Sequence, residues 1–167
     1  MALELRWISA PSLDAELAND RDRLATEIGA TVTEWPPDGG EWDRDAMRFF
    51  RQAIDDPSFD RLWGPAYVVD DGRLVASAGF LGPPDDGGEV EVGFSVCRCE
   101  RQRGVGAATV ALLCELASQK GCRSIRARTT MENTPAVATL QHNAFRLVEL
   151  FSSSGDHRRV LYRRRLP

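Results

Sequence analysis

Residues 89–107 read Glu-Val-Glu-Val-Gly-Phe-Ser-Val-Cys-Arg-Cys-Glu-Arg-Gln-Arg-Gly-Val-Gly-Ala. In its first eight residues, valine or phenylalanine stands at every second position. Side chains of a strand point alternately to opposite faces, so this alternation predicts a strand with one buried face. After a short charged connector, the sequence takes on helical periodicity at about Val105. The stretch therefore predicts a strand, a glycine-containing turn and a helix N-terminus in succession.

The turn between the strand and the helix has the composition of an anion-binding site. Gly104 and Gly106 lack a Cβ atom, so a ligand can approach the backbone closely. The first N–H groups of a helix have no intrahelical acceptor, and the helix dipole makes that end positive. Arg101 and Arg103 add two formal charges. Such a turn predicts a phosphate or pyrophosphate ligand; the alternative is a turn in which the glycines only ease packing.

Three phosphate-binding motifs compete for this turn. A Walker A loop requires a lysine directly after its last glycine, and Ala107 stands there, so this motif is excluded. A dinucleotide fingerprint requires a third glycine, where Thr109 stands, and an acidic residue about 20 positions on, where the sequence is basic. The third motif, [RQ]-x-x-G-x-[GA] directly after an amphipathic strand, is matched in full by residues 101–106.

Length and composition predict a single domain over residues 1–167. The net charge of −4 and the pI near 5.3 argue against a protein that binds nucleic acid. The sequence has no run of about 18 apolar residues and no signal-peptide core, so we expect a cytoplasmic protein that does not bind a membrane. The spacing of the four cysteines favours free thiols over a metal site.

The remaining elements follow from periodicity and from turn residues. A tight hairpin turn is predicted at Asp70-Asp71-Gly72. Helices are predicted from Ser12, as the N-cap, to Ile28, over residues 42–54 with Trp42 as an anchor, from Gly106 to about Lys120, and from Pro135 onward. Strands are predicted over residues 3–8, 63–69, 74–81, 89–96, 124–129, 145–151 and 158–166. The fold class is therefore mixed α/β.

Residues 90–150 resemble the GNAT superfamily of N-acetyltransferases. The turn at residues 101–106 is similar to its coenzyme A pyrophosphate loop. Asn133-Thr134-Pro135-Ala136 is similar to its N-x-x-[AS] motif, and residues 140–145 are similar to its L-x-x-x-G-F motif. Two details are most similar to the branch that includes ribosomal-protein N-terminal acetyltransferases. They are Glu91 shortly before Gly93-Phe94, and the sequence Glu-Asn-Thr-Pro-Ala at 132–136.

This resemblance implies a mostly antiparallel sheet of about seven strands, flanked by helices and splayed at its centre around coenzyme A. It implies acetyl-CoA as the cosubstrate, no metal, and a small-molecule amine or a peptide N-terminus as the acceptor. Homodimers are common in the superfamily. Asn133 and the backbone around Phe94 and Val96 would bind the pantetheine arm. The implied pyrophosphate ligands are Arg101, Arg103 and the backbone of Gly104, Val105, Gly106 and Ala107.

Glu91 is the predicted general base. It lies mid-strand on the face opposite the valines, together with Glu89, Gly93 and Ser95. Holding the amine and the thioester together can lower the activation barrier by about 7–11 kcal/mol. The general base therefore need not be strong, and it can act directly or through a water molecule. The alternative for both glutamates is a solvated strand face.

Two positions depart from the superfamily pattern. Leu140 stands where many members have a tyrosine that protonates the leaving thiolate, so the general acid is unassigned. This departure supports the alternative function, an acyl-CoA-binding or sensing domain without catalysis. Ala144 stands where the motif has glycine, a change that is tolerated if its backbone φ is negative.

Overall fold

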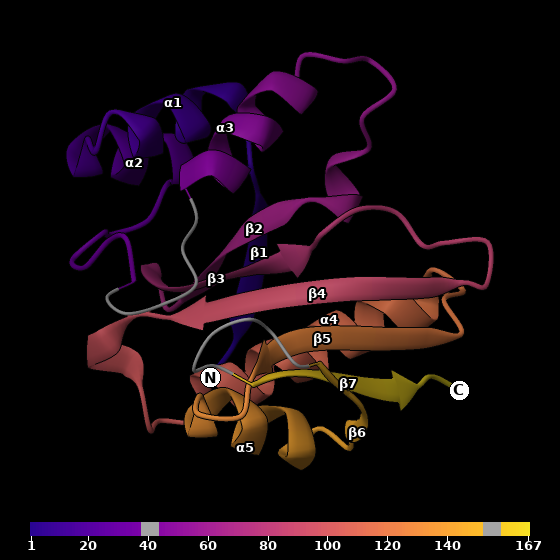
Figure 1. Cartoon of the computed structure of the whole chain (residues 1–167). Helices are drawn as coiled ribbons and strands as arrows, with labels where there is room; N and C mark the ends of the chain where they lie inside the picture. Colours follow the sequence, from indigo (N-terminus) through magenta and orange to yellow (C-terminus); the bar gives the residue numbers. More distant parts are fainter. Residues whose placement is uncertain (38–43, 152–157) are drawn as a thin grey trace. The chain divides into compact units, whose positions relative to one another are not determined.

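The structure, a computed structural model, describes residues 1–37, 44–151 and 158–167 (Figure 1). Seven strands form one sheet in the order β1-β2-β3-β4-β5-β7-β6, which confirms the predicted mixed α/β class with a mostly antiparallel sheet and flanking helices. The splay at its centre stays a prediction. The elements are β1 (Leu3–Trp7), α1 (Ala10–Leu17), α2 (Arg21–Ile28), α3 (Arg44–Ala53), β2 (Pro65–Asp70), β3 (Arg73–Phe80), β4 (Glu89–Val96), α4 (Val105–Gln119), β5 (Ser124–Thr130), α5 (Thr134–His142), β6 (Arg146–Phe151) and β7 (Arg159–Arg165).

The chain divides into two compact units. The first unit is Met1–Gly79 with Phe94–Val105 and holds α1 to α3 and β1 to β3, apart from the last residue of β3. The second unit is Phe80–Gly93 with Gly106–Pro167 and holds β5 to β7 and α5. A boundary between the units falls within β4, and another falls in the first turn of α4. A single domain over residues 1–167 stays a prediction.

In the first unit, the antiparallel strands β1, β2 and β3 share an apolar core with the helices α1 to α3. The predicted hairpin is confirmed: Asp71 and Gly72 join β2 to β3 with φ angles of +48° and +69°, which suit a tight turn between twisted strands. The core includes Ile8, Leu13, Leu24, Phe50 and Tyr67.

One predicted helix of the first unit is in fact two. Asn19 takes a positive φ of 56°, and Asp20 caps α2 by accepting a hydrogen bond from the Arg23 N–H at 3.0 Å. The predicted N-cap was wrong too, because Ser9 caps α1 and Ser12 forms the reciprocal half of the capping box. The predicted anchor Trp42 lies outside the described residues.

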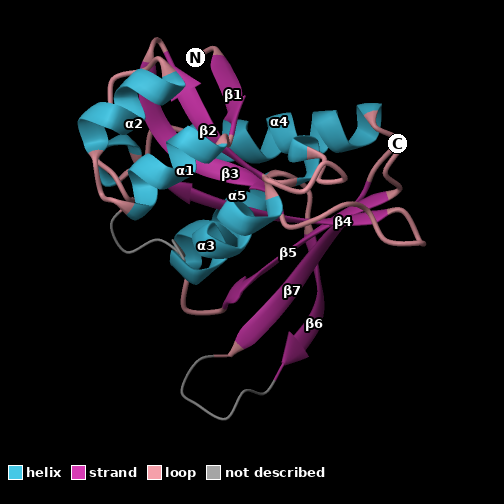
Figure 2. Ribbon diagram, turned by 90° about the horizontal axis from the view of Figure 1, so that it is seen from above, coloured by secondary structure: helices cyan, strands magenta, loops and turns pink. Residues whose placement is uncertain are grey.

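In the second unit, β4 runs parallel to β5, and β5, β7 and β6 lie side by side in antiparallel pairs (Figure 2). The predicted alternation of β4 is confirmed at Val90 and Val92, which are buried. Along β5, Ile125 and Ala127 are buried, and α5 lies against this strand. The side chains between them, which include Arg126, belong to the opposite face. This polar face bears the predicted base.

Within the described ranges, no helix has the length and apolar character needed to span a bilayer. The described residues also contain no group of three or more His, Cys, Asp or Glu side chains placed to hold a metal ion. All four cysteines are free thiols; Cys97, Cys114 and Cys122 are buried and Cys99 is exposed.

Candidate active site

The predicted phosphate-binding turn leads directly into α4. β4 ends at Val96, residues 98–100 form one turn of 3₁₀ helix, and α4 begins at Val105. Gln102 and Gly104 take positive φ angles of 59° and 79°. Apart from its chain neighbours, no heavy atom of the described chain lies within 4 Å of where a Cβ atom of Gly104 would stand. The left-handed backbone therefore favours glycine here, and the space beside that backbone is open to a ligand.

Glu100 holds this turn in place. Its side chain is 8% exposed and binds two arginines: Arg73 Nη1 lies 3.1 Å from Oε1, and Arg103 Nη1 lies 2.7 Å from Oε2. A buried carboxylate is stable only when it is paired with charged groups. Because one partner of Glu100 lies in the turn and the other at the start of β3, Glu100 links the turn to that strand. Arg101 donates from Nε to the carbonyl oxygen of Val96 at 3.2 Å. Both arginines of the predicted phosphate site therefore also hold the backbone of the turn.

Glu34 supports the same connector from a distant part of the first unit. Its carboxylate accepts a hydrogen bond from the Cys99 N–H at 2.9 Å, and this bond holds the pKa of Glu34 below its ordinary value. The Sγ of Cys97 donates to the backbone carbonyl of Glu34 at 3.4 Å. Burial, helped by the charge of Glu34, raises the pKa of Cys97 to about 12. Cys97 is therefore a protonated structural thiol at neutral pH.

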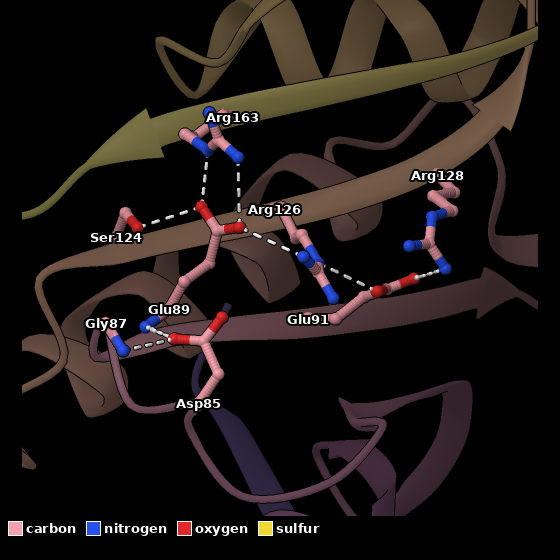
Figure 3. Close-up of polar contacts among 8 residues, drawn as sticks. All are labelled: Asp85, Gly87, Glu89, Glu91, Ser124, Arg126, Arg128 and Arg163. Atoms are coloured by element: carbon pink, nitrogen blue, oxygen red, sulfur yellow. Dashed lines mark hydrogen bonds and ion pairs between the residues drawn. The ribbon is translucent and has the colours of Figure 1, made fainter. Parts of the chain in front are cut away.

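The predicted base Glu91 lies between two arginines of β5 (Figure 3). The parallel register of β4 and β5 sets Glu91 opposite Arg126. Arg126 Nε lies 2.9 Å from Oε2 of Glu91, and Arg128 Nη1 lies 3.3 Å from Oε1. The side chain of Glu91 is 13% exposed, so the two cations hold a largely buried carboxylate in a fixed position. Its role as the base stays a prediction.

Glu89, two residues earlier on the same face, has more partners. It accepts hydrogen bonds from Ser124 Oγ at 2.9 Å, from Arg126 Nη1 at 3.1 Å, and from both Nε and Nη2 of Arg163 on β7. Burial by itself raises the pKa of Glu89, but hydrogen bonds from Arg163 and Ser124 outweigh burial, so this pKa lies below its ordinary value. Glu89 is thus an ionised anchor that joins β4, β5 and β7.

Asn133, predicted to bind the pantetheine arm, caps α5. Its Oδ1 accepts a hydrogen bond from the Ala136 N–H at 3.3 Å, and its own N–H donates to the Thr130 carbonyl at 3.2 Å. In the part of the chain that the structure describes, the Nδ2 of Asn133 has no hydrogen-bond partner. The capping role therefore leaves an amide donor for a ligand. Leu140, on the same helix, is buried and offers no proton.

Asn143, which no sequence motif marked as functional, connects α5 to α4. This buried side chain donates from Nδ2 to the Ala107 carbonyl at 3.1 Å and to the Thr139 carbonyl at 3.0 Å. Ala107 belongs to the predicted pyrophosphate loop, so Asn143 positions that loop. Only the packing of the two helices reveals this role. The next residue, Ala144, has a φ of +62°, so the condition under which alanine replaces glycine here without strain is not met.

Comparison with known proteins gives the family. A model of the acetyltransferase (GNAT) family matches residues 29–145, which is more than half of the chain. The chain belongs to this acetyltransferase (GNAT) family. Its membership confirms the resemblance that the turn and the two later motifs indicated. The matched GNAT region includes Glu91, the turn before α4 and Asn133.

Individual relatives agree with this assignment. The uncharacterized N-acetyltransferase YjdG of Bacillus subtilis (strain 168) is 29% identical over 147 residues, which cover 86% of this chain and 85% of that protein. The ribosomal-protein-S18-alanine N-acetyltransferase from Escherichia coli has a TM-score of 0.68 at 12% identity, over 99% of this chain and 94% of the other. A GNAT superfamily phosphinothricin acetyltransferase from Sinorhizobium meliloti in complex with AcCoA has a TM-score of 0.66 at 19% identity. The match covers 99% of this chain and 89% of the other. The two solved structures establish a shared fold.

Proposed function

We propose that this chain is an acetyl-CoA-dependent N-acetyltransferase that acts on a primary amine of a small molecule or of a peptide N-terminus. The observation that carries the proposal is the turn before α4, where Gly104 has a left-handed φ and open space beside its backbone. The N-acetyltransferase relative YjdG and the AcCoA complex of a structural neighbour support acetyl-CoA as the donor. The free cysteines support a reducing compartment such as the cytoplasm.

The chain offers two kinds of group to acetyl-CoA. Positive charge and N–H groups at the start of α4 suit its pyrophosphate, because unpaired helix N–H groups and arginine forks both donate to phosphate oxygens. The Nδ2 of Asn133 suits a carbonyl oxygen of the pantetheine arm, to which the backbone at Phe94 and Val96 would also pair. The proposed pyrophosphate ligands are Arg101, Arg103, Gly104, Val105, Gly106 and Ala107.

The reaction is a direct acyl transfer. The neutral amine of the acceptor attacks the thioester carbonyl carbon, a C–N bond forms, and the C–S bond breaks. The nitrogen loses one proton and the departing sulfur gains one, so the protons balance. In our proposal Glu91 accepts the amine proton, directly or through a water molecule, because its carboxylate is fixed by Arg126 and Arg128.

A thermal melt tests cosubstrate binding. At 100 times its dissociation constant, a ligand that binds only the native state adds about 2.7 kcal/mol, which is roughly 5–10 °C for a protein of this size. We expect such a shift with acetyl-CoA and CoA, and none with NAD or ATP. Amine-dependent release of CoA thiol then tests catalysis. A shift without thiol release for any amine would favour an acyl-CoA-binding domain, and no shift at all would contradict the proposal.

A further inference from the structure

The polar face of the second unit carries more positive charge than its glutamates neutralise. Directly opposite residues of paired strands share a face, so the register of β4 to β7 defines this surface, which we call the arginine face. Six arginines and three glutamates belong to it, in a chain whose net charge is −4. They are Arg126, Arg128, Arg146, Arg159, Arg163, Arg165, Glu89, Glu91 and Glu149.

The two β4 glutamates are satisfied mainly by two of these arginines. Arg163 donates to both carboxylate oxygens of Glu89, and Arg126 bridges Glu89 and Glu91. These contacts join the two glutamates of β4 to arginines of β5 and β7. They explain why Arg126 and Arg163 are present without any ligand.

Arg128 and Arg159 are not explained in this way. Arg128 is 54% exposed, and its one ion-pair contact among the described residues is the 3.3 Å approach of Nη1 to Glu91. Arg159 is exposed and has no ion pair within the described part of the chain. The register pairs Arg128 with Leu161 and Thr130 with Arg159, so the two arginines are diagonal neighbours on one face. Diagonal neighbours lie about 7–8 Å apart, so two arginine side chains can converge on one anion.

The chemistry of the guanidinium group determines which ligand fits. Its planar fork matches the oxygens of a carboxylate or a phosphate, with two parallel hydrogen bonds per group. Arg128 also touches Glu91, the proposed acceptor of the amine proton. An anion at Arg128 would therefore lie next to the reacting amine.

We propose that Arg128 and Arg159 bind an anionic group of the acceptor, a carboxylate or a phosphate a few bonds from its amine. This inference rests on the proposed acetyltransferase function, because it names the class of acceptor for that reaction. The acceptor is thus an amino-acid-like or phosphorylated amine. Arg146 and Arg165, exposed on the same face at other positions, serve as matched controls.

The first test measures binding and does not depend on turnover. In protein saturated with CoA, the arginine Nε–H signals are followed by NMR during titration with succinate or with inorganic phosphate, at constant ionic strength set by chloride. We expect saturable shifts of Arg128 and Arg159, assigned with Arg128→Lys, and none for Arg146 or Arg165. Comparing the two titrations distinguishes a carboxylate site from a phosphate site. Equal shifts at all arginines, or no saturable shift at Arg128, would overturn the proposal.

The second test measures specificity in matched amines such as β-alanine against propylamine and phosphoethanolamine against ethanolamine. We expect the anionic member to be preferred, and Arg128→Gln to raise its KM about tenfold or more, the usual effect of losing a charged hydrogen bond. Arg165→Gln should leave that KM unchanged. A weaker CoA affinity in Arg128→Gln would place this arginine in the cosubstrate site and refute the inference. Failure of acetyl-CoA to bind the unmodified protein would refute the proposed function instead.

Discussion

Arg103 Nη1 lies 2.7 Å from Oε2 of Glu100, whose other carboxylate oxygen binds Arg73 at 3.1 Å. The turn before α4 is thus attached to β3 through one buried side chain. Glu100 precedes the glycine motif and is not part of it. The shape of the predicted phosphate site therefore depends on a residue outside the motif.

Replacing Glu100 with alanine should weaken acetyl-CoA binding about tenfold, because the turn loses the carboxylate that fixes Arg103. Calorimetric titration of the variant with acetyl-CoA measures this change. Glu115→Ala, at an exposed position of α4, is the matched control and should bind normally. An unchanged dissociation constant in Glu100→Ala would show that the turn keeps its shape without this ion pair.

Glu91→Gln should lower kcat about a hundredfold, the usual contribution of a positioned general base. Glutamine preserves the size of the side chain but cannot accept the amine proton. Steady-state thiol release at saturating acetyl-CoA measures kcat. Glu89→Gln is the comparison on the same strand face, and we expect it to lower the melting temperature far more than kcat. If Glu91→Gln keeps full kcat across pH, another group is the base.

Glu89 should make stability depend on pH in a predictable direction. The pKa of Glu89 in the folded protein lies below the ordinary value of 4.5. The contribution of Glu89 to the free energy of unfolding is therefore complete above pH 4.5 and is lost as pH falls through the folded-state pKa. The melting-temperature gap between the unmodified protein and Glu89→Gln should therefore be constant near neutrality and shrink below about pH 4.5. Scanning calorimetry from pH 7 to pH 3 measures the gap. A gap that widens on acidification would reverse the assigned direction.

Ala144→Gly should stabilise the protein by up to about 1 kcal/mol, or roughly 2–4 °C. The φ of +62° costs an alanine more than a glycine, and the greater freedom of glycine in the unfolded chain offsets only part of that gain. Ala111→Gly, at an exposed position inside α4, should instead destabilise by about 1 kcal/mol. Denaturant unfolding of both variants measures the change in the free energy of unfolding. If both substitutions changed it in the same direction, the positive φ of Ala144 would not explain the result.

Local signals in the sequence were sufficient for several elements. The alternation at Val90 and Val92 predicted β4, the Asp71-Gly72 pair predicted the hairpin, and Gly104 marked the turn before α4. Each of these depends on residues that are neighbours in the chain, where periodicity and backbone preference act directly. The family motifs are local in the same sense, because each spans only four to six consecutive residues.

Other features depend on contacts between distant segments, which no local pattern encodes. Glu89 and Arg163 are 74 positions apart and meet because β4 pairs with β5 and β5 with β7. The hydrogen bond from Asn143 to Ala107 likewise needs the packing of α5 against α4. The break at Asn19 was missed for a different reason, because the apolar stripe continues across it.

The separation of Glu89 from Arg163 also matters while the chain is being made. A ribosome that adds 5–20 residues per second needs roughly 4–15 s to extend the nascent chain across these 74 positions. During that interval Glu89 has Ser124 and Arg126 as partners, 35 and 37 positions away, but lacks both hydrogen bonds from Arg163. Because β7 pairs with both β5 and β6, a ribosome that stalls before Arg159 leaves these two strands without the strand that joins them.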